Sequence, residues 1–138
     1  LDHGGLIHDS QRDQVYRCSR PASQLALRAA EATRGEMPVQ QGVLNPFGTV
    51  HAGALIWFAD VVATRLALQG ADVSTGGSGF PLAINITAQL LSNVTSGTLT
   101  ARSRYVKKGR TMQVVRTEVT SEDGKVLLDL TSSHISSR

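Results

Sequence analysis

The 138 residues predict one domain of globular composition, since 41% are apolar and 18% are charged and one hydrophobic core of this size is feasible. A single cysteine, Cys18, excludes an internal disulfide framework and a multi-cysteine zinc site, and it favours a reducing compartment. The net charge of +3, carried by eleven arginines and three lysines against eleven acids, is compatible with nucleic acid, an anionic membrane or a phosphorylated ligand.

The N-terminal part of the chain carries the weakest patterns. Residues 1–24 are polar and have no sustained period, so we expect a weakly structured arm followed by a single domain over 25–138. Residues 25–34 are rich in alanine and leucine and favour a helix by intrinsic propensity. Residues 40–53 contain three glycines and a proline, which predicts a loop.

The clearest helix runs from residue 53 to about 69, with Gly70 as its C-cap, and it is apolar on nearly every side, as buried helices are. Every later segment predicts a strand. Alternation of polar and less polar side chains is clearest from Thr98 to Tyr105, and short turns predict a sequential antiparallel meander. One buried helix followed by four strands is an α+β layout. The predicted strands are 81–91, 98–107, 111–121 and 125–135.

No membrane segment is expected. The first residues have no apolar core of signal-peptide length. The longest apolar stretch, 54–68, contains Asp60, Thr64 and Arg65 and is predicted to be too short to cross a bilayer. We therefore expect a cytoplasmic protein that does not bind a membrane.

Asp60 is the first candidate functional residue, because it lies in the middle of the apolar helix. Burying an unpaired carboxylate costs roughly several kcal/mol, so a buried aspartate normally has a charged or hydrogen-bonding partner or a function. Arg65 is five residues away and lies off the face of Asp60, whereas Thr64, at four residues, shares that face. A functional carboxylate supported by Thr64 is the favoured interpretation.

The start of the helix, at residues 50–53, is the second candidate. Its small residues let another group approach the backbone, and the exposed amides at the positive end of the helix dipole can bind an oxyanion. The side chain of His51 could act as a general base. A histidine at a helix start is more commonly a structural residue that hydrogen-bonds the backbone. Asn45 is equally explained as a turn residue.

A basic run is the third candidate. We expect several of its members to meet at one edge of the sheet. A solvated sheet face is the general interpretation, and a nucleic-acid site would need interleaved aromatic residues, of which Tyr105 is the one present. The phosphates of a small ligand fit better, so no nucleic-acid partner is expected. The run has no acid and consists of Arg102, Arg104, Lys107, Lys108, Arg110 and Arg116.

The segment 45–60, NPFGTVHAGALIWFAD, resembles the signature of hotdog-fold acyl-CoA thioesterases: Asn or Gln, then Gly, then His followed by small residues, and an Asp or Glu within the helix. The resemblance is greatest to the phenylacetyl-CoA-pathway and 4-hydroxybenzoyl-CoA thioesterase branch and covers about residues 25–135. It implies a long central helix wrapped by a curved antiparallel sheet of five to six strands. It also implies a strand over 27–39 in place of the helix favoured by propensity.

The resemblance implies that the chain hydrolyses an acyl-CoA or aroyl-CoA thioester to the free acid and CoA, with no metal and no cofactor. Asp60 would be the nucleophile or the general base, and the amide of Ala52 would polarise the thioester carbonyl. The other catalytic positions that it implies are Asn45, His51, Gly53 and Thr64. The positions implied for CoA are Lys107, Lys108, Gly109, Arg110 and Thr111.

The resemblance also implies a homodimer, commonly paired into a tetramer, because in this family the carboxylate and the Asn–His loop of one site come from different subunits. Two positions depart from the family pattern: Ala52 replaces a glycine, and Ala83 replaces the serine that some relatives carry near the carboxylate. Four aromatic residues fit either an aryl or medium-chain acyl pocket or plain core packing. These are Phe47, Trp57, Phe58 and Phe80.

Two other functions remain open at this point. A non-catalytic acyl-CoA-binding module would use the basic run without turnover. A hotdog hydratase or dehydratase would use a histidine and a carboxylate as an acid–base pair, for which His51 and Asp60 are the candidates. The identity of the acyl group, and a choice between CoA and an acyl-carrier protein, do not follow from the sequence.

Overall fold

The computed structural model describes residues 32–69, 71 and 73–138. The predicted arm over 1–24, the first part of the predicted strand 27–39 and the predicted cap Gly70 lie outside the described residues. The elements, in chain order, are β1 (Ala32–Pro38), the 3₁₀ turn η3 (Gln41–Val43), α3 (Ala52–Gln69), β2 (Pro81–Leu90), β3 (Thr98–Lys108), β4 (Met112–Thr120) and β5 (Val126–Ser136).

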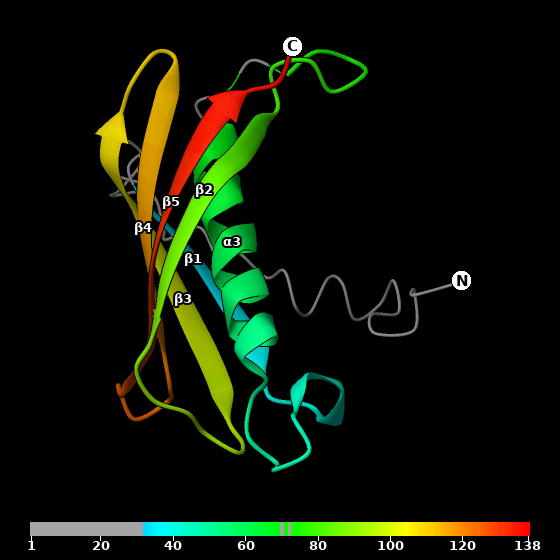
Figure 1. Ribbon diagram of the computed structural model, residues 1–138, viewed down its shortest axis with the longest axis vertical. Helices are drawn as coiled ribbons and strands as arrows, with labels where there is room; N and C mark the ends of the chain where they lie inside the picture. Colours follow the sequence, from blue (N-terminus) through cyan, green and yellow to red (C-terminus); the bar gives the residue numbers. More distant parts are fainter. Residues whose placement is uncertain (1–31, 70, 72) are drawn as a thin grey trace, which may run out of the picture.

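The five strands form one antiparallel sheet in the order β1-β3-β4-β5-β2, and α3 lies along one face of it (Figure 1). This arrangement confirms the expected α+β class and hotdog fold. The expected meander is correct for β3, β4 and β5 but wrong for β2, which pairs with β5 and leaves β3 to pair with β1. Residues 91–97 carry the chain across the sheet, and composition alone does not distinguish such a crossover from a hairpin turn.

The first strand shows tertiary packing overriding helix propensity. Within the described residues the segment is a strand, as the family resemblance implies, and the helix expected up to Arg34 is wrong. Burial alternates along it, with Thr33, Gly35 and Met37 facing the helix. A Cβ atom at Gly35 would lie 2.7 Å from Val62 Cγ2, so this glycine permits the close approach of α3 to β1.

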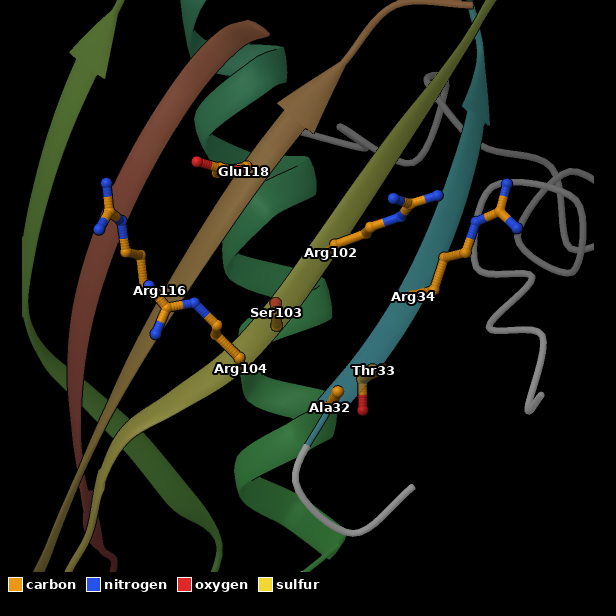
Figure 2. Close-up of a pocket in the computed structure, with 8 residues that line it drawn as sticks. All are labelled: Ala32, Thr33, Arg34, Arg102, Ser103, Arg104, Arg116 and Glu118. Atoms are coloured by element: carbon orange, nitrogen blue, oxygen red, sulfur yellow. The ribbon is translucent and has the colours of Figure 1, made fainter. Parts of the chain in front are cut away.

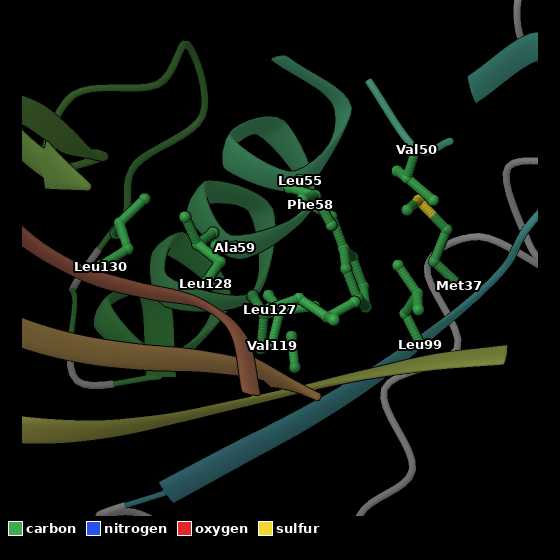
Figure 3. Packing of buried hydrophobic residues seen from close by; sticks show 12 residues of the cluster. Met37, Val50, Leu55, Phe58, Ala59, Leu99, Val119, Leu127, Leu128 and Leu130 are labelled. Carbon is green, nitrogen blue, oxygen red and sulfur yellow. The ribbon is translucent and has the colours of Figure 1, made fainter. Parts of the chain in front are cut away.

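The core lies between the inner face of the sheet and one side of α3 (Figure 3). Phe58 and Leu55 pack there against strand residues such as Leu99 and Leu128, and each fully buried side chain of this size contributes about 1.5–3 kcal/mol. The helix is apolar on most sides, yet only one side is buried in this chain. Its buried residues are Leu55, Phe58, Ala59, Val62, Ala63, Leu66 and Ala67.

By length and composition alone, α3 is long enough to cross a membrane, which corrects the expectation that its apolar stretch is too short. The test that it passes is also passed by the core helices of globular domains, and α3 packs its buried residues onto the sheet as such a helix does. Length therefore does not separate the two interpretations, whereas packing favours the core helix.

Candidate active site

Asp60 lies half-buried near the middle of α3, beside a pocket of about 490 Å³ between the second half of the helix and the start of β2. The structure thus brings together Asp60, Thr64 and Phe80, three residues that the sequence proposed for the site. The pocket is lined by Asp60, Val61, Thr64, Arg65, Leu68, Phe80, Pro81, Leu82 and Ala83.

The carboxyl group of Asp60 is set up to accept a proton. Its Oδ1 atom is buried and has no hydrogen-bond partner among the described residues. Burial raises the pKa of Asp60 above its ordinary value, and the nearby His134 opposes this shift. A less acidic carboxyl group is a stronger base once ionised, so its environment suits proton abstraction from water or attack on a carbonyl carbon.

The start of α3 leaves one backbone amide available. His51 is the N-cap: its carbonyl oxygen accepts hydrogen bonds from the amides of Ala54 (2.9 Å) and Leu55 (3.1 Å). The amide of Gly53 donates to His51 Nδ1 at 2.8 Å. Among the described residues, none accepts a hydrogen bond from the amide of Ala52, which is exposed. The helix end therefore presents the N–H of Ala52, rather than that of Gly53, to a ligand.

The loop before the helix is held by two asparagines. Asn45 Oδ1 accepts hydrogen bonds from the amides of Phe47 (3.0 Å) and Thr49 (3.2 Å), and Asn45 Nδ2 donates to Thr49 Oγ1 at 2.7 Å. The side chain of Asn93, which the sequence analysis did not single out, makes two hydrogen bonds to the backbone of Val50. Its Oδ1 accepts a hydrogen bond from the Val50 amide at 3.1 Å, and its Nδ2 donates one to the Val50 carbonyl at 2.8 Å. The position of the Ala52 amide thus depends on this rigid loop.

Within one chain, the amide and the carboxylate are far apart. Eight residues of helix separate Ala52 from Asp60, which is roughly 12 Å along the axis. One thioester carbonyl is too small to touch both groups across this distance. The loop residues Asn45, His51 and Gly53 lie at the same end of α3 as Ala52, so the candidate site residues of a single chain form two separate groups, which we call half-sites.

The basic run does not meet at one edge, contrary to expectation. Arg102, Arg104 and Arg116 project from the outer face of the sheet, together with Arg34, around a pocket of about 330 Å³ (Figure 2). Arg116 binds Asp129 through Nε (3.0 Å) and Nη2 (2.6 Å). This face is opposite to α3 and Asp60, because side chains alternate along β3 and β4.

The other basic residues lie at the end of β3, which holds Lys107 and Lys108, and in the turn to β4, which holds Arg110. A bulge between Tyr105 and Lys107 shifts the alternation, so that Lys108 returns towards the helix side, with Nζ 5.2 Å from the centre of the Tyr105 ring. The turn requires Gly109, since a Cβ there would collide with the carbonyl of Met112, to which the Gly109 amide donates at 3.0 Å. Arg110 and Thr111 complete the turn, at the same end of the sheet as the pocket of Asp60.

The aromatic residues divide between site and core. Phe80 lines the pocket of Asp60, whereas Phe58 is buried in the core and Trp57 packs partly against it. Phe47 is 90% exposed at the tip of the Asn45 loop. Among the described aromatic residues, Phe80 is therefore the one that lines the pocket together with Asp60.

His134 is the polar neighbour of Asp60 that the sequence analysis missed. It is 1% exposed on the inner face of β5, and its Nε2 lies 2.9 Å from Ser132 Oγ. Burial lowers the pKa of His134, and Asp60 opposes this shift. The available signal was the two-residue period of β5, which places Leu128, Leu130, Ser132 and His134 on one face. In the described part of the chain, no group of three His, Cys, Asp or Glu residues is placed to hold a metal ion.

Comparison with known families supplies the classification. The family model described as the thioesterase superfamily matches residues 47–128, which is more than half of the chain. The chain belongs to the thioesterase superfamily. The matched segment includes Ala52 and Asp60 and runs from the Phe47 loop through α3, β2, β3 and β4 to the start of β5, whereas Asn45 lies just before it.

Curated relatives agree with this membership. A provisionally named esterase of Haemophilus influenzae is 30% identical over 93 residues, which are 65% of this chain and 62% of that protein. One of Bacillus subtilis is 30% identical over 98 residues, which are 71% of this chain and 75% of that protein. The match therefore spans less than two thirds of the Haemophilus protein.

Solved structures share the fold. A thioesterase of Pseudomonas aeruginosa, solved as a mutant, superposes with a TM-score of 0.74 at 23% identity, covering 99% of this chain and 94% of that one. A hypothetical thioesterase of Streptococcus pneumoniae solved with coenzyme A gives a TM-score of 0.68 at 19% identity, covering 77% and 81%. At these identities the likeness shows the fold alone.

Proposed function

We propose that this thioesterase-superfamily chain hydrolyses an acyl-CoA or aroyl-CoA thioester to the carboxylic acid and CoA. The single observation that carries the proposal is the Asp60 carboxyl group, which has a buried oxygen without a partner and adjoins a pocket. The CoA bound to the structurally similar pneumococcal protein supports CoA as the carrier.

The proposed reaction uses Asp60, one backbone amide and water. As a general base, the Asp60 carboxylate takes a proton from water while the water oxygen bonds to the thioester carbon. The carbonyl oxygen becomes an oxyanion, which the amide of Ala52 stabilises. When the oxyanion collapses, the C–S bond breaks, and the thiolate leaves as CoA after gaining a proton. As a nucleophile, Asp60 would instead bond to the thioester carbon and expel the CoA thiolate as the C–S bond breaks, which forms an acyl anhydride that water then hydrolyses to the acid and free Asp60.

A homodimer, with two such dimers forming a tetramer, is part of the proposal. Strand β2 is paired on one side only, and exposed apolar residues follow this edge from Leu82, which lines the pocket of Asp60, to the far end of the strand. An exposed apolar edge strand has unpaired backbone N–H and C=O groups and therefore tends to pair with another chain. A second copy at this edge would bring its own helix start to the carboxylate and so close the gap of roughly 12 Å between the half-sites. The exposed residues are Leu82, Ile84, Ile86 and Leu90 of β2 and Leu91, which directly follows it.

For the CoA moiety, we propose the end of β3 and the β3–β4 turn as the binding segment, which consists of Lys107, Lys108, Gly109, Arg110 and Thr111. The turn lies at the end of the sheet where the pocket opens, and its lysine and arginine side chains can neutralise phosphates. Phe80, which lines the pocket of Asp60, is proposed to contact the acyl group. Thr64 is proposed to assist the carboxylate from one helical turn away.

The test is a panel of thioesters with aryl, short and medium acyl groups, each on CoA and on an acyl-carrier protein. Release of free thiol is measured with a chromogenic disulfide. We expect hydrolysis of at least one CoA thioester and a preference that ranks the acyl groups. Tight binding of CoA esters without thiol release across the panel would instead indicate a binding module.

A further inference from the structure

Three of the buried side-chain atoms without a hydrogen-bond partner gather in one place. They are Asp60 Oδ1 on α3, Gln113 Oε1 on β4 and His134 Nδ1 on β5. Gln113 and His134 are directly opposite each other across β4 and β5, and the buried neighbours along each strand place both on the inner face. Buried polar atoms are normally paired, and leaving one unpaired costs about 1–3 kcal/mol. Such a concentration indicates a functional requirement.

His134 is held on one side and open on the other. Its Nε2 is fixed by Ser132 Oγ at 2.9 Å, which leaves Nδ1 as the ring atom without a partner among the described residues. On the other side of β5, its cross-strand neighbour is Ala83, which lines the pocket of Asp60. At 1% exposure, His134 is too enclosed to reach a substrate. Any role in the reaction must therefore pass through Asp60.

We propose that His134 is a positioning residue for Asp60, holding the carboxylate in its reactive orientation and ionised state from behind the pocket. The inference rests on the proposed function, because it assigns Asp60 as the reacting group. With the Ser132 hydroxyl donating to Nε2, the neutral ring carries its proton on Nδ1. This donor is not hydrogen-bonded to Asp60 in the structure, but it lies on the inner face of β5, the side of the sheet that carries α3 and the unpaired Asp60 Oδ1. The proposed role of this donor is the orienting role of the third group in nucleophile–base sites.

The charges around Asp60 make His134 the dominant polar neighbour. Burial raises the pKa of Asp60, and the nearby His134 opposes this rise. In the same way, burial lowers the pKa of His134, and the nearby Asp60 opposes this fall. The other titratable groups on this side are Arg65 on α3 and Tyr105 and Lys108 on β3. Tyr105 donates its hydroxyl proton to the Leu66 carbonyl at 2.8 Å, and Lys108 lies over the Tyr105 ring. The inner faces of β2 and β4 contribute no titratable group near Asp60.

The first experiment follows the carbon-13 signal of the Asp60 carboxyl group through a pH titration of the full chain. In His134→Gln, we expect the midpoint to move to higher pH, because the group that opposes the effect of burial is lost. The acid limb of kcat/KM for the best thioester should move in the same direction, since Asp60 must be ionised to act. The control Ser103→Ala removes another buried hydroxyl, bonded to Thr117 Oγ1 at 2.6 Å, and should leave the midpoint unchanged.

The reciprocal variant keeps the test valid if His134→Gln does not fold. In Asp60→Asn, the imidazole signal of His134 should titrate at lower pH than in the wild type, because coupling between two sites is reciprocal. Unchanged midpoints in both variants would overturn the proposal. If both midpoints shift but no thioester is hydrolysed by the wild type, the proposed function fails while the coupling of His134 to Asp60 stands.

Discussion

Replacing Asp60 with asparagine should lower kcat for thioester hydrolysis by roughly 10²–10⁴-fold, the usual contribution of a positioned general base. Asparagine preserves the shape of the side chain but can neither take a proton from water nor form an anhydride. Because the substrate would still be held by the pocket and the β3–β4 turn, KM should change much less. Steady-state kinetics on the best thioester of the panel measures both values.

The same variant should be at least as stable as the wild type at neutral pH. Burial raises the folded-state pKa of Asp60 above its unfolded value, so the charged form is penalised on folding. Below the unfolded-state pKa of Asp60, the protonated carboxyl group carries no such penalty. As pH rises through the folded-state pKa, the carboxyl group ionises and the free energy of unfolding falls. Asparagine, which stays neutral, avoids this loss, and thermal unfolding followed from below the ordinary Asp pKa of 3.8 up to pH 8 measures it. A fall in kcat with a collapse of stability would point to misfolding instead.

Asp129→Asn is the matched control. It removes an aspartate that lies on the outer face of the sheet and binds Arg116 there. We expect kcat to stay near the wild-type value in this variant. Equal losses of activity in Asp60→Asn and Asp129→Asn would contradict a specific role for Asp60.

Ala52→Pro should lower kcat by about 10²–10³-fold, the typical effect of losing one oxyanion donor. Ala52 follows the N-cap His51 and so occupies the first helical position, where proline is well tolerated because its fixed φ suits the helix. The substitution therefore deletes one N–H group, which has no acceptor among the described residues, and leaves α3 intact. Steady-state kinetics and the circular dichroism spectrum measure the two effects.

Ala52→Gly is the control for this variant, since it retains the amide and restores the residue type found in the family signature. We expect the kcat of Ala52→Gly to stay within roughly a few-fold of the wild-type value. Undiminished hydrolysis by Ala52→Pro would show that another donor stabilises the oxyanion.

The sequence predicted the elements well because their signals are local. The apolar run around Asp60 and the two-residue periods of the strands report burial directly, and a carboxylate within such a run is conspicuous. The order of the strands is not local. Nothing in residues 91–97 distinguishes a hairpin from a crossover, so β2 was placed beside β3 instead of β5.

The geometry of the candidate site could be predicted only in part, for the same reason. The Ala52 amide emerged from the family signature, but its availability depends on His51 Nδ1 occupying the Gly53 amide, a detail of cap geometry. His134 lies 74 positions after Asp60 in a run of serines and threonines, and only the register of β5 brings it to the carboxylate. The arginines of β3 and β4 formed one cluster in sequence, yet alternation sends Arg102, Arg104 and Arg116 to the outer face.

The central claim is that two copies of the chain share each site, with Asp60 from one and the Ala52 amide from the other. Mixing Asp60→Asn with Ala52→Pro by co-refolding tests it most directly. Half of the dimers would then be mixed, and one of the two sites in each would be intact, so about a quarter of the wild-type specific activity should return. Activity that stays at the level of the separate variants would contradict a shared site.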